Sequence, residues 1–108
     1  MDAVERFEEI VDDLAARDPD VEASQMMGRP SIKAGGKLIA CFEKRGAMAF
    51  KLPDEGEQEK ALALEGARIY DPSERGRLMN GWIEVPAAHE ARWPALAETA
   101  LRLRKENA

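Results

Sequence analysis

The chain has 108 residues and a net charge of −5, with 44% hydrophobic and 34% charged residues. This size and balance fit one globular domain over residues 1–108 and exclude a disordered tail. A single cysteine excludes an intramolecular disulfide, which makes a reducing cytoplasm the simplest location, and no apolar run is long enough to cross a membrane.

The first predicted element is a helix over residues 2–17. Apolar residues recur there at three- and four-residue spacing, which places them on one stripe. The stripe consists of Val4, Phe7, Ile10, Val11 and Leu14. Asp2 is the expected N-cap, with Glu5 three residues later, and Asp18-Pro19 ends the helix. Residues 21–27 fit either a short strand or an extended approach to the sheet.

An antiparallel meander is predicted next, because short alternating segments are joined by tight turns. Its strands are residues 31–34, 37–44 and 47–52. Gly35-Gly36 and Arg45-Gly46 are the turns, since glycine supplies the positive φ angles of two-residue hairpins. Alternation in the middle strand places Leu38, Ala40 and Phe42 on one face and Ile39, Cys41 and Glu43 on the other. Met26, Met27 and Met48 are expected to fill gaps in the core.

The second half of the chain repeats this alternation of helix and strand. We expect a helix over residues 55–64, strands over 67–70 and 82–85 separated by a polar connection, and a final helix that begins near Ala91 with Pro94 in its first turn. The order α-β-β-β-α-β-β-α predicts a two-layer α+β fold with a five-stranded antiparallel sheet. Pairing of two copies through a sheet edge or face would make a homodimer, which the sequence leaves open.

No combination of residues in this sequence specifies a reaction. Cys41 lies mid-strand among apolar residues, and His89, the only histidine, precedes the last helix. One histidine with scattered carboxylates is no metal signature, and the glycines lack the spacing of a phosphate-binding loop. We therefore expect no catalytic residues, no metal and no cofactor, and we interpret the chain as a non-enzymatic interaction module.

Two binding hypotheses remain as alternatives. Residues 28–53 contain six basic side chains against one acid, Glu43, whereas residues 1–22 are strongly acidic. The basic set is Arg29, Lys33, Lys37, Lys44, Arg45 and Lys51, and it would contact phosphates if the chain binds DNA. Alternatively Arg75 and Arg77, with Arg29 or His89, would hold a small anionic ligand.

A family resemblance adds to this interpretation. The stretches MMGRPSIKAGGKLIACFEKRGAMAFKLP, GARIYDP and NGWIEVP resemble the MmcQ/YjbR-like family and the related TfoX N-terminal domain. The matching positions are Met27, Gly28, Pro30, Gly36, Lys37, Lys51, Leu52, Gly66, Pro72, Gly81 and Trp82. The resemblance implies a small two-layer α+β domain. It also implies a link to DNA binding or competence, the description often given to members, and no defined catalytic residues.

Overall fold

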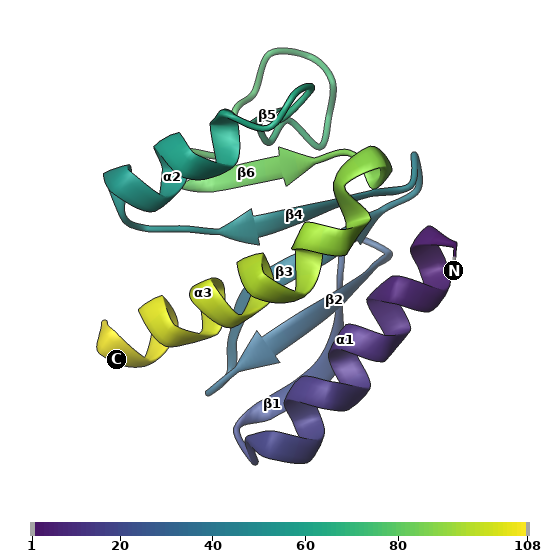
Figure 1. The fold of residues 1–108 in the computed structure, drawn as a ribbon, viewed down its shortest axis with the longest axis vertical. Helices are drawn as coiled ribbons and strands as arrows, with labels where there is room; N and C mark the ends of the chain where they lie inside the picture. Colours follow the sequence, from purple (N-terminus) through teal and green to yellow (C-terminus); the bar gives the residue numbers. More distant parts are fainter. Residues whose placement is uncertain (1, 108) are drawn as a thin grey trace.

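Three α-helices cover one face of a six-stranded antiparallel sheet in the computed structural model, which describes residues 2–107 (Figure 1). In chain order the elements are α1 (Ala3–Arg17), β1 (Val21–Met26), β2 (Arg29–Ala34), β3 (Lys37–Glu43), β4 (Ala47–Lys51), α2 (Glu55–Leu62), β5 (Arg68–Ile69), β6 (Trp82–Val85), the 3-10 helix η1 (Ala87–Arg92) and α3 (Trp93–Glu106). The predicted two-layer α+β class is confirmed.

The sheet has the strand order β1-β2-β3-β4-β6-β5, with β1 and β5 at its edges. The expected count of five strands is wrong by one, because residues 21–26 form β1 and pair with β2 along its whole length. The local sequence pattern could not distinguish this strand from an extended loop, because only Val21 in it is buried. Its pairing partner β2 settles its conformation.

Helix α1 begins as the sequence predicts. The Asp2 carboxylate accepts a hydrogen bond from the Glu5 backbone N–H at 2.8 Å, the contact expected of an N-cap. Phe7, Ile10 and Leu14 are buried against the sheet. Val4, the first residue of the predicted stripe, is instead exposed, because it lies at the margin of the buried stripe, whereas its neighbour Ala3 packs against the core.

A β-bulge in β3 changes which side chains face the helices. Ile32 pairs with Ala40, whereas the next residue of β2, Lys33, pairs with Leu38, so Ile39 is an extra residue on β3. Ile39 therefore joins the helix-side core together with Ala40. Leu38 packs on the opposite face, so the alternation predicted for these two positions is wrong.

The core under the helices is entirely apolar. Trp93, the first residue of α3, is fully buried, and its indole N–H donates to the Val85 carbonyl at 3.2 Å. Its ring meets Phe42 edge to face, with centroids 6.4 Å apart. Pro94 lies in the first turn of α3 as predicted, and the residues before it form η1 instead of α-helix.

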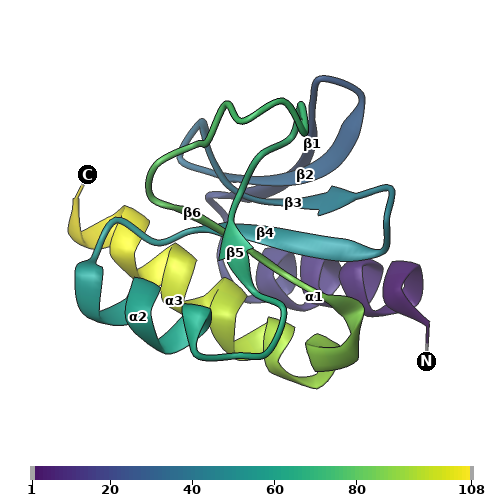
Figure 2. The same cartoon turned by 90° about the horizontal axis from the view of Figure 1, so that it is seen from above.

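The opposite face of the sheet, called the open face here, carries a smaller apolar cluster of Cys41, Ala49, Tyr70 and Trp82. Figure 2 shows that residues 71–81, the connection between β5 and β6, cross this face, while the helices lie on the other. Within residues 2–107, no helix has the length and hydrophobicity needed to span a bilayer.

Candidate binding site on the open face

Residues 71–81 have a defined shape because the Asp71 carboxylate holds their first turn. Its two oxygens accept backbone hydrogen bonds from Glu74 at 2.9 Å and Gly76 at 2.8 Å. Burial alone would raise the pKa of Asp71, but these hydrogen bonds favour the charged carboxylate and lower its pKa below the ordinary value. The segment is thus held by a charged group at its base.

Beneath this segment the carboxylate of Glu43 is buried. One of its oxygens accepts from Arg29 Nε at 2.8 Å and from the Tyr70 hydroxyl at 2.5 Å. Burial alone would raise the pKa of Glu43, but the hydrogen bonds from Tyr70 and Arg29 and the Arg29 charge together lower it. Arg29 also donates to the Pro72 carbonyl at 3.1 Å, so this cluster links β2 and β3 to the segment above.

Cys41 lies beside the same tyrosine. Its thiol is within 3.5 Å of the Tyr70 hydroxyl and is fully buried, as the sequence predicts for a small apolar residue. Burial raises the pKa of Cys41 to about 11 and raises the pKa of Tyr70 as well. The thiol is therefore protonated at neutral pH, which does not suit a nucleophile.

A second buried carboxylate lies further along the open face. Glu84 of β6 is ion-paired with Arg45 and, at 3.3 Å, with Arg68. Arg45 also reaches Glu74 of the crossing segment at 2.5 Å. Both buried acids on the strands of the open face, Glu43 and Glu84, are therefore matched by arginine, as buried charges require.

A groove of about 370 Å³ opens between the β1–β2 turn and the crossing segment. Its lining residues are Met27, Arg29, Pro72, Ser73, Arg77 and Met79, and it is called the Met27 groove from here on. Most of its surface is apolar, and two arginines contribute the charge. Concave apolar surfaces with a few convergent polar groups are the usual form of binding sites.

Met27 itself is held in an unfavourable backbone conformation. It has a φ of 50°, in the left-handed region, and Gly28 follows with a φ of 79°, as in a two-residue hairpin turn. A left-handed conformation costs a non-glycine residue about 1 to 2 kcal/mol. The Met27 side chain is nevertheless 70% exposed, so it gains little from burial within the chain.

Two of the six basic residues predicted to contact nucleic acid form ion pairs with carboxylates of the same chain. Arg29 is paired with Glu43, and Arg45 with Glu84. Both guanidinium groups compensate buried carboxylates of the open face, so most of their charge is neutralised within the domain. The sequence could not show this, because each pair joins residues far apart along the chain.

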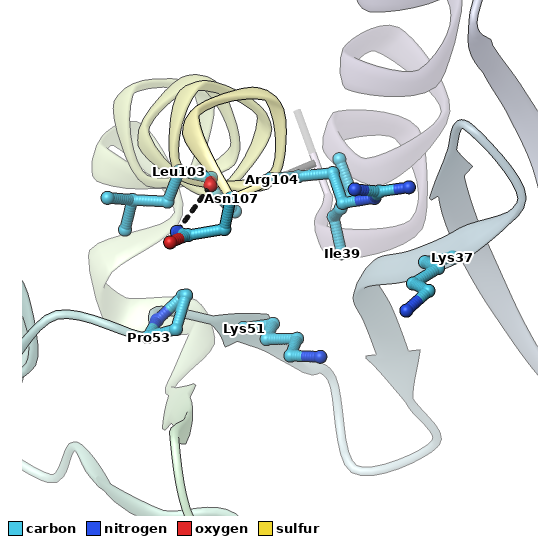
Figure 3. A pocket seen from close by; sticks show the side chains of 8 residues that line it. Lys37, Ile39, Lys51, Pro53, Leu103, Arg104 and Asn107 are labelled. Carbon is cyan, nitrogen blue, oxygen red and sulfur yellow. Dashed lines mark hydrogen bonds between the residues drawn. The ribbon is translucent and has the colours of Figure 1, made fainter.

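The four predicted lysines are distributed over different parts of the sheet. Lys33 lies within β2, and Lys44 lies in the turn after β3. Lys37 and Lys51 come together at a separate cavity beside the last turn of α3 (Figure 3). The structure therefore brings together two of the six predicted residues and leaves the others apart from them.

Of the three residues predicted to hold a small anion, Arg77 lies at the Met27 groove with Arg29. Arg75 is exposed on the same segment and does not line the groove. His89 belongs to η1 on the helix side, where its Nε2 lies 2.7 Å from the Glu65 carbonyl oxygen. Arg75, Arg77 and His89 therefore do not converge on one site.

The exposure of Met27 was not predicted from the sequence. Met27 was expected to fill a core gap; Met48 does so, but Met27 does not. The signal that identifies Met27 is its place directly before Gly28 and shortly before the predicted meander, because a glycine at such a position is typical of a turn and hence of the surface. Met79 carries no comparable signal, because its position depends on the path of the crossing segment.

The fold and the groove together define a two-layer α+β domain with an apolar groove on its open face. No group of three or more His, Cys, Asp or Glu side chains within residues 2–107 is arranged to hold a metal ion. No protein-family model, curated protein or solved structure matches the chain. Membership of the MmcQ/YjbR-like family stays a prediction.

Proposed function

We propose that the chain is a non-catalytic interaction module that contacts a partner protein through the Met27 groove. The single observation that carries the proposal is Met27, a large apolar side chain that is 70% exposed at a φ of 50°. Glycine or asparagine would suit this turn better and would leave no apolar surface in water. Contact with a partner supplies the burial that this side chain lacks within the chain.

The chemistry of the groove specifies the partner segment. Methionine adapts to differently shaped apolar surfaces, and both methionine and arginine are enriched at protein interfaces. Leu78, between two groove residues in sequence, is also an exposed apolar residue of the same segment. We infer that the partner contributes an apolar side chain next to a carboxylate, which pairs with Arg77.

This proposal places the module in the cytoplasm, where the single cysteine stays reduced. It does not depend on the family resemblance. It also differs from the DNA-binding alternative, because the groove has two arginines in an apolar surround and not a row of phosphate contacts.

The test is a selection of short random peptides displayed against the purified full chain, followed by calorimetric titration of the selected sequences. We expect selected peptides to combine an acidic and an apolar residue. Met27→Gly and Arg77→Glu should each weaken binding about tenfold or more, the loss of a contact worth about 1.4 kcal/mol. Arg75→Glu is the matched control, since it makes the same charge change on the same segment outside the groove, and it should stay within about twofold of the wild type.

Two outcomes would overturn the proposal. One is a selection in which no peptide depends on Met27 or Arg77. The other is peptides whose affinity falls equally with Arg75→Glu and Arg77→Glu, which indicates attraction by net charge alone.

A further inference from the structure

A second cavity lies at the other end of the sheet, between the C-terminal turn of α3 and the ends of β3 and β4 (Figure 3). Its volume is about 140 Å³, and it is called the Lys37 cavity here. Its apolar wall is made by Ile39, Pro53, Ala100 and Leu103. The wall is rigid, because Ile39, Ala100 and Leu103 belong to the main core.

Three cations surround this cavity: Lys37, Lys51 and Arg104. None of the three has a carboxylate within ion-pair distance among residues 2–107. The neighbouring cations of α3 are different, since Lys105 is paired with Asp18 at 2.8 Å. A group of three cations without a carboxylate partner among residues 2–107 makes this cavity attractive to an external anion, although the chain as a whole has a net charge of −5.

Arg104 is held in place on this wall. Its Nε donates to the Ala34 carbonyl at 3.1 Å and its Nη2 to the Gly35 carbonyl at 3.2 Å. Both acceptors are neutral, so the guanidinium is oriented without losing its charge, and its Nη1 remains available to donate. Figure 3 shows Lys37 and Lys51 with their ammonium ends facing one another across the cavity mouth.

The dipole of α3 is too weak to neutralise these three positive charges. The C-terminal end of α3 carries about half an elementary negative charge, against three positive ones. The Asn107 side chain donates to the Leu103 carbonyl at 2.8 Å and so satisfies part of that end. Two carboxylates next in sequence to groups around the cavity are engaged elsewhere: Asp20 contacts Lys105, and Asp54, which follows Pro53, caps α2. Among residues 2–107, about two and a half positive charges therefore remain uncompensated.

We propose that the Lys37 cavity binds a small organic phosphate monoester. The phosphate lies among the two ammonium groups and the Arg104 guanidinium, and its organic part lies on Ile39 and Leu103. A phosphate monoester carries about −1.5 to −2 charges at neutral pH, which matches the surplus better than a single carboxylate does. Lysines serve as point charges for phosphate, and the fixed arginine adds directional hydrogen bonds. This site is separate from the Met27 groove and does not depend on the function proposed for it.

The test is a ¹H–¹⁵N NMR titration of the full chain with phenyl phosphate, with inorganic phosphate and with sodium chloride at matched ionic strength. We expect saturable shifts of the amides of Lys37, Ile39, Lys51 and Leu103 with phenyl phosphate, and weaker binding of inorganic phosphate. Lys37→Gln/Lys51→Gln should abolish saturation. Lys33→Gln/Lys44→Gln removes the same net charge outside the cavity and should leave the titration unchanged. A normal starting spectrum for each variant shows that it is folded.

The proposal is overturned if phenyl phosphate shifts these amides no more than sodium chloride does. It is equally overturned if both double variants reduce binding alike. A third contrary result is a short DNA duplex that displaces phenyl phosphate and binds more weakly in both double variants, because that result assigns the lysines to a broad nucleic-acid surface.

Discussion

The two faces of the sheet bury their side chains by different physical means. The helix-covered face is filled with apolar residues such as Ile32, Phe50 and Val85, which have no polar group to satisfy. The strands of the open face bury two carboxylates, Glu43 and Glu84, each paired with arginine. Apolar burial contributes most of the free energy of folding, whereas a buried ion pair roughly offsets its own desolvation.

This difference indicates that the buried ion pairs of the open face mainly hold side chains and segments in position and contribute less to the stability of the fold. Its ion pairs connect strands to the segment of residues 71–81, and that segment supplies four of the six residues that line the Met27 groove. If this is right, changes on the helix-covered face should reduce stability most. Changes on the open face should have smaller effects that depend on charge and on backbone conformation.

The largest effect is expected for Trp93→Ala, which removes a fully buried side chain from the helix-covered face. We expect the free energy of unfolding to fall by about 3 to 5 kcal/mol, from lost transfer free energy and the cavity left behind. Urea unfolding followed by far-UV circular dichroism measures it. Leu78→Ala is the control on the crossing segment and should change stability by less than about 0.5 kcal/mol. A loss below that of Glu43→Gln would reverse the ranking of the two faces.

An intermediate effect is expected for Glu43→Gln on the open face. The change leaves Arg29, whose side chain is 18% exposed, without its charged partner. We expect a loss of about 2 to 3 kcal/mol at pH 7, below the full cost of breaking a buried pair because Arg29 keeps the Pro72 carbonyl. Glu8→Gln, on the exposed face of α1, is the control and should cost less than about 0.5 kcal/mol.

The contribution of the Glu43–Arg29 pair to stability should also depend on pH. The pKa of Glu43 is lower in the folded protein than its ordinary value of 4.5, so folding favours the charged form. The resulting stability is complete above the unfolded-state pKa and disappears as the pH falls through the folded-state pKa. The stability difference between wild type and Glu43→Gln should therefore shrink in acid, as shown by urea unfolding at a series of pH values. A difference that stays constant from pH 7 to pH 3 would contradict the charge-based explanation.

The smallest effect, and the one of opposite sign, is expected for Met27→Gly. Glycine adopts the φ of 50° without the side-chain penalty, so stability should rise by about 1 kcal/mol. Thermal or urea unfolding measures this gain. Ser24→Gly, in the extended strand β1, should instead lower stability by about 0.5 to 1 kcal/mol. A loss of stability in Met27→Gly would show that this side chain serves the fold and would weaken the case for a binding role.

The sequence predicted local features well where one face of an element is buried. The Asp2 cap, the Gly35-Gly36 turn and the alternation in β6 are confirmed, because each depends on residues within a few positions. The prediction failed at Leu38 and Ile39, because a bulge depends on the register against β2. It also failed to separate β1 from an extended loop, since an edge strand shows little alternation.

The candidate sites depended on contacts that no local pattern contains. Arg29 was predicted as a phosphate ligand, and its actual partner is Glu43, brought near by the β2–β3 pairing. Lys37 and Lys51 were predicted among six basic residues, but only the packing of α3 shows that they share a cavity with Arg104.

The sequence by itself determined the order of the helices and of five of the six strands, the α+β class and most of the residues that face the helices, because periodicity and turn chemistry act over a few residues. Only the tertiary structure decided which charges compensate one another and which remain free at a cavity. The physical reason is that ion pairs and grooves are made between segments far apart along the chain, and their energies depend on burial and distance.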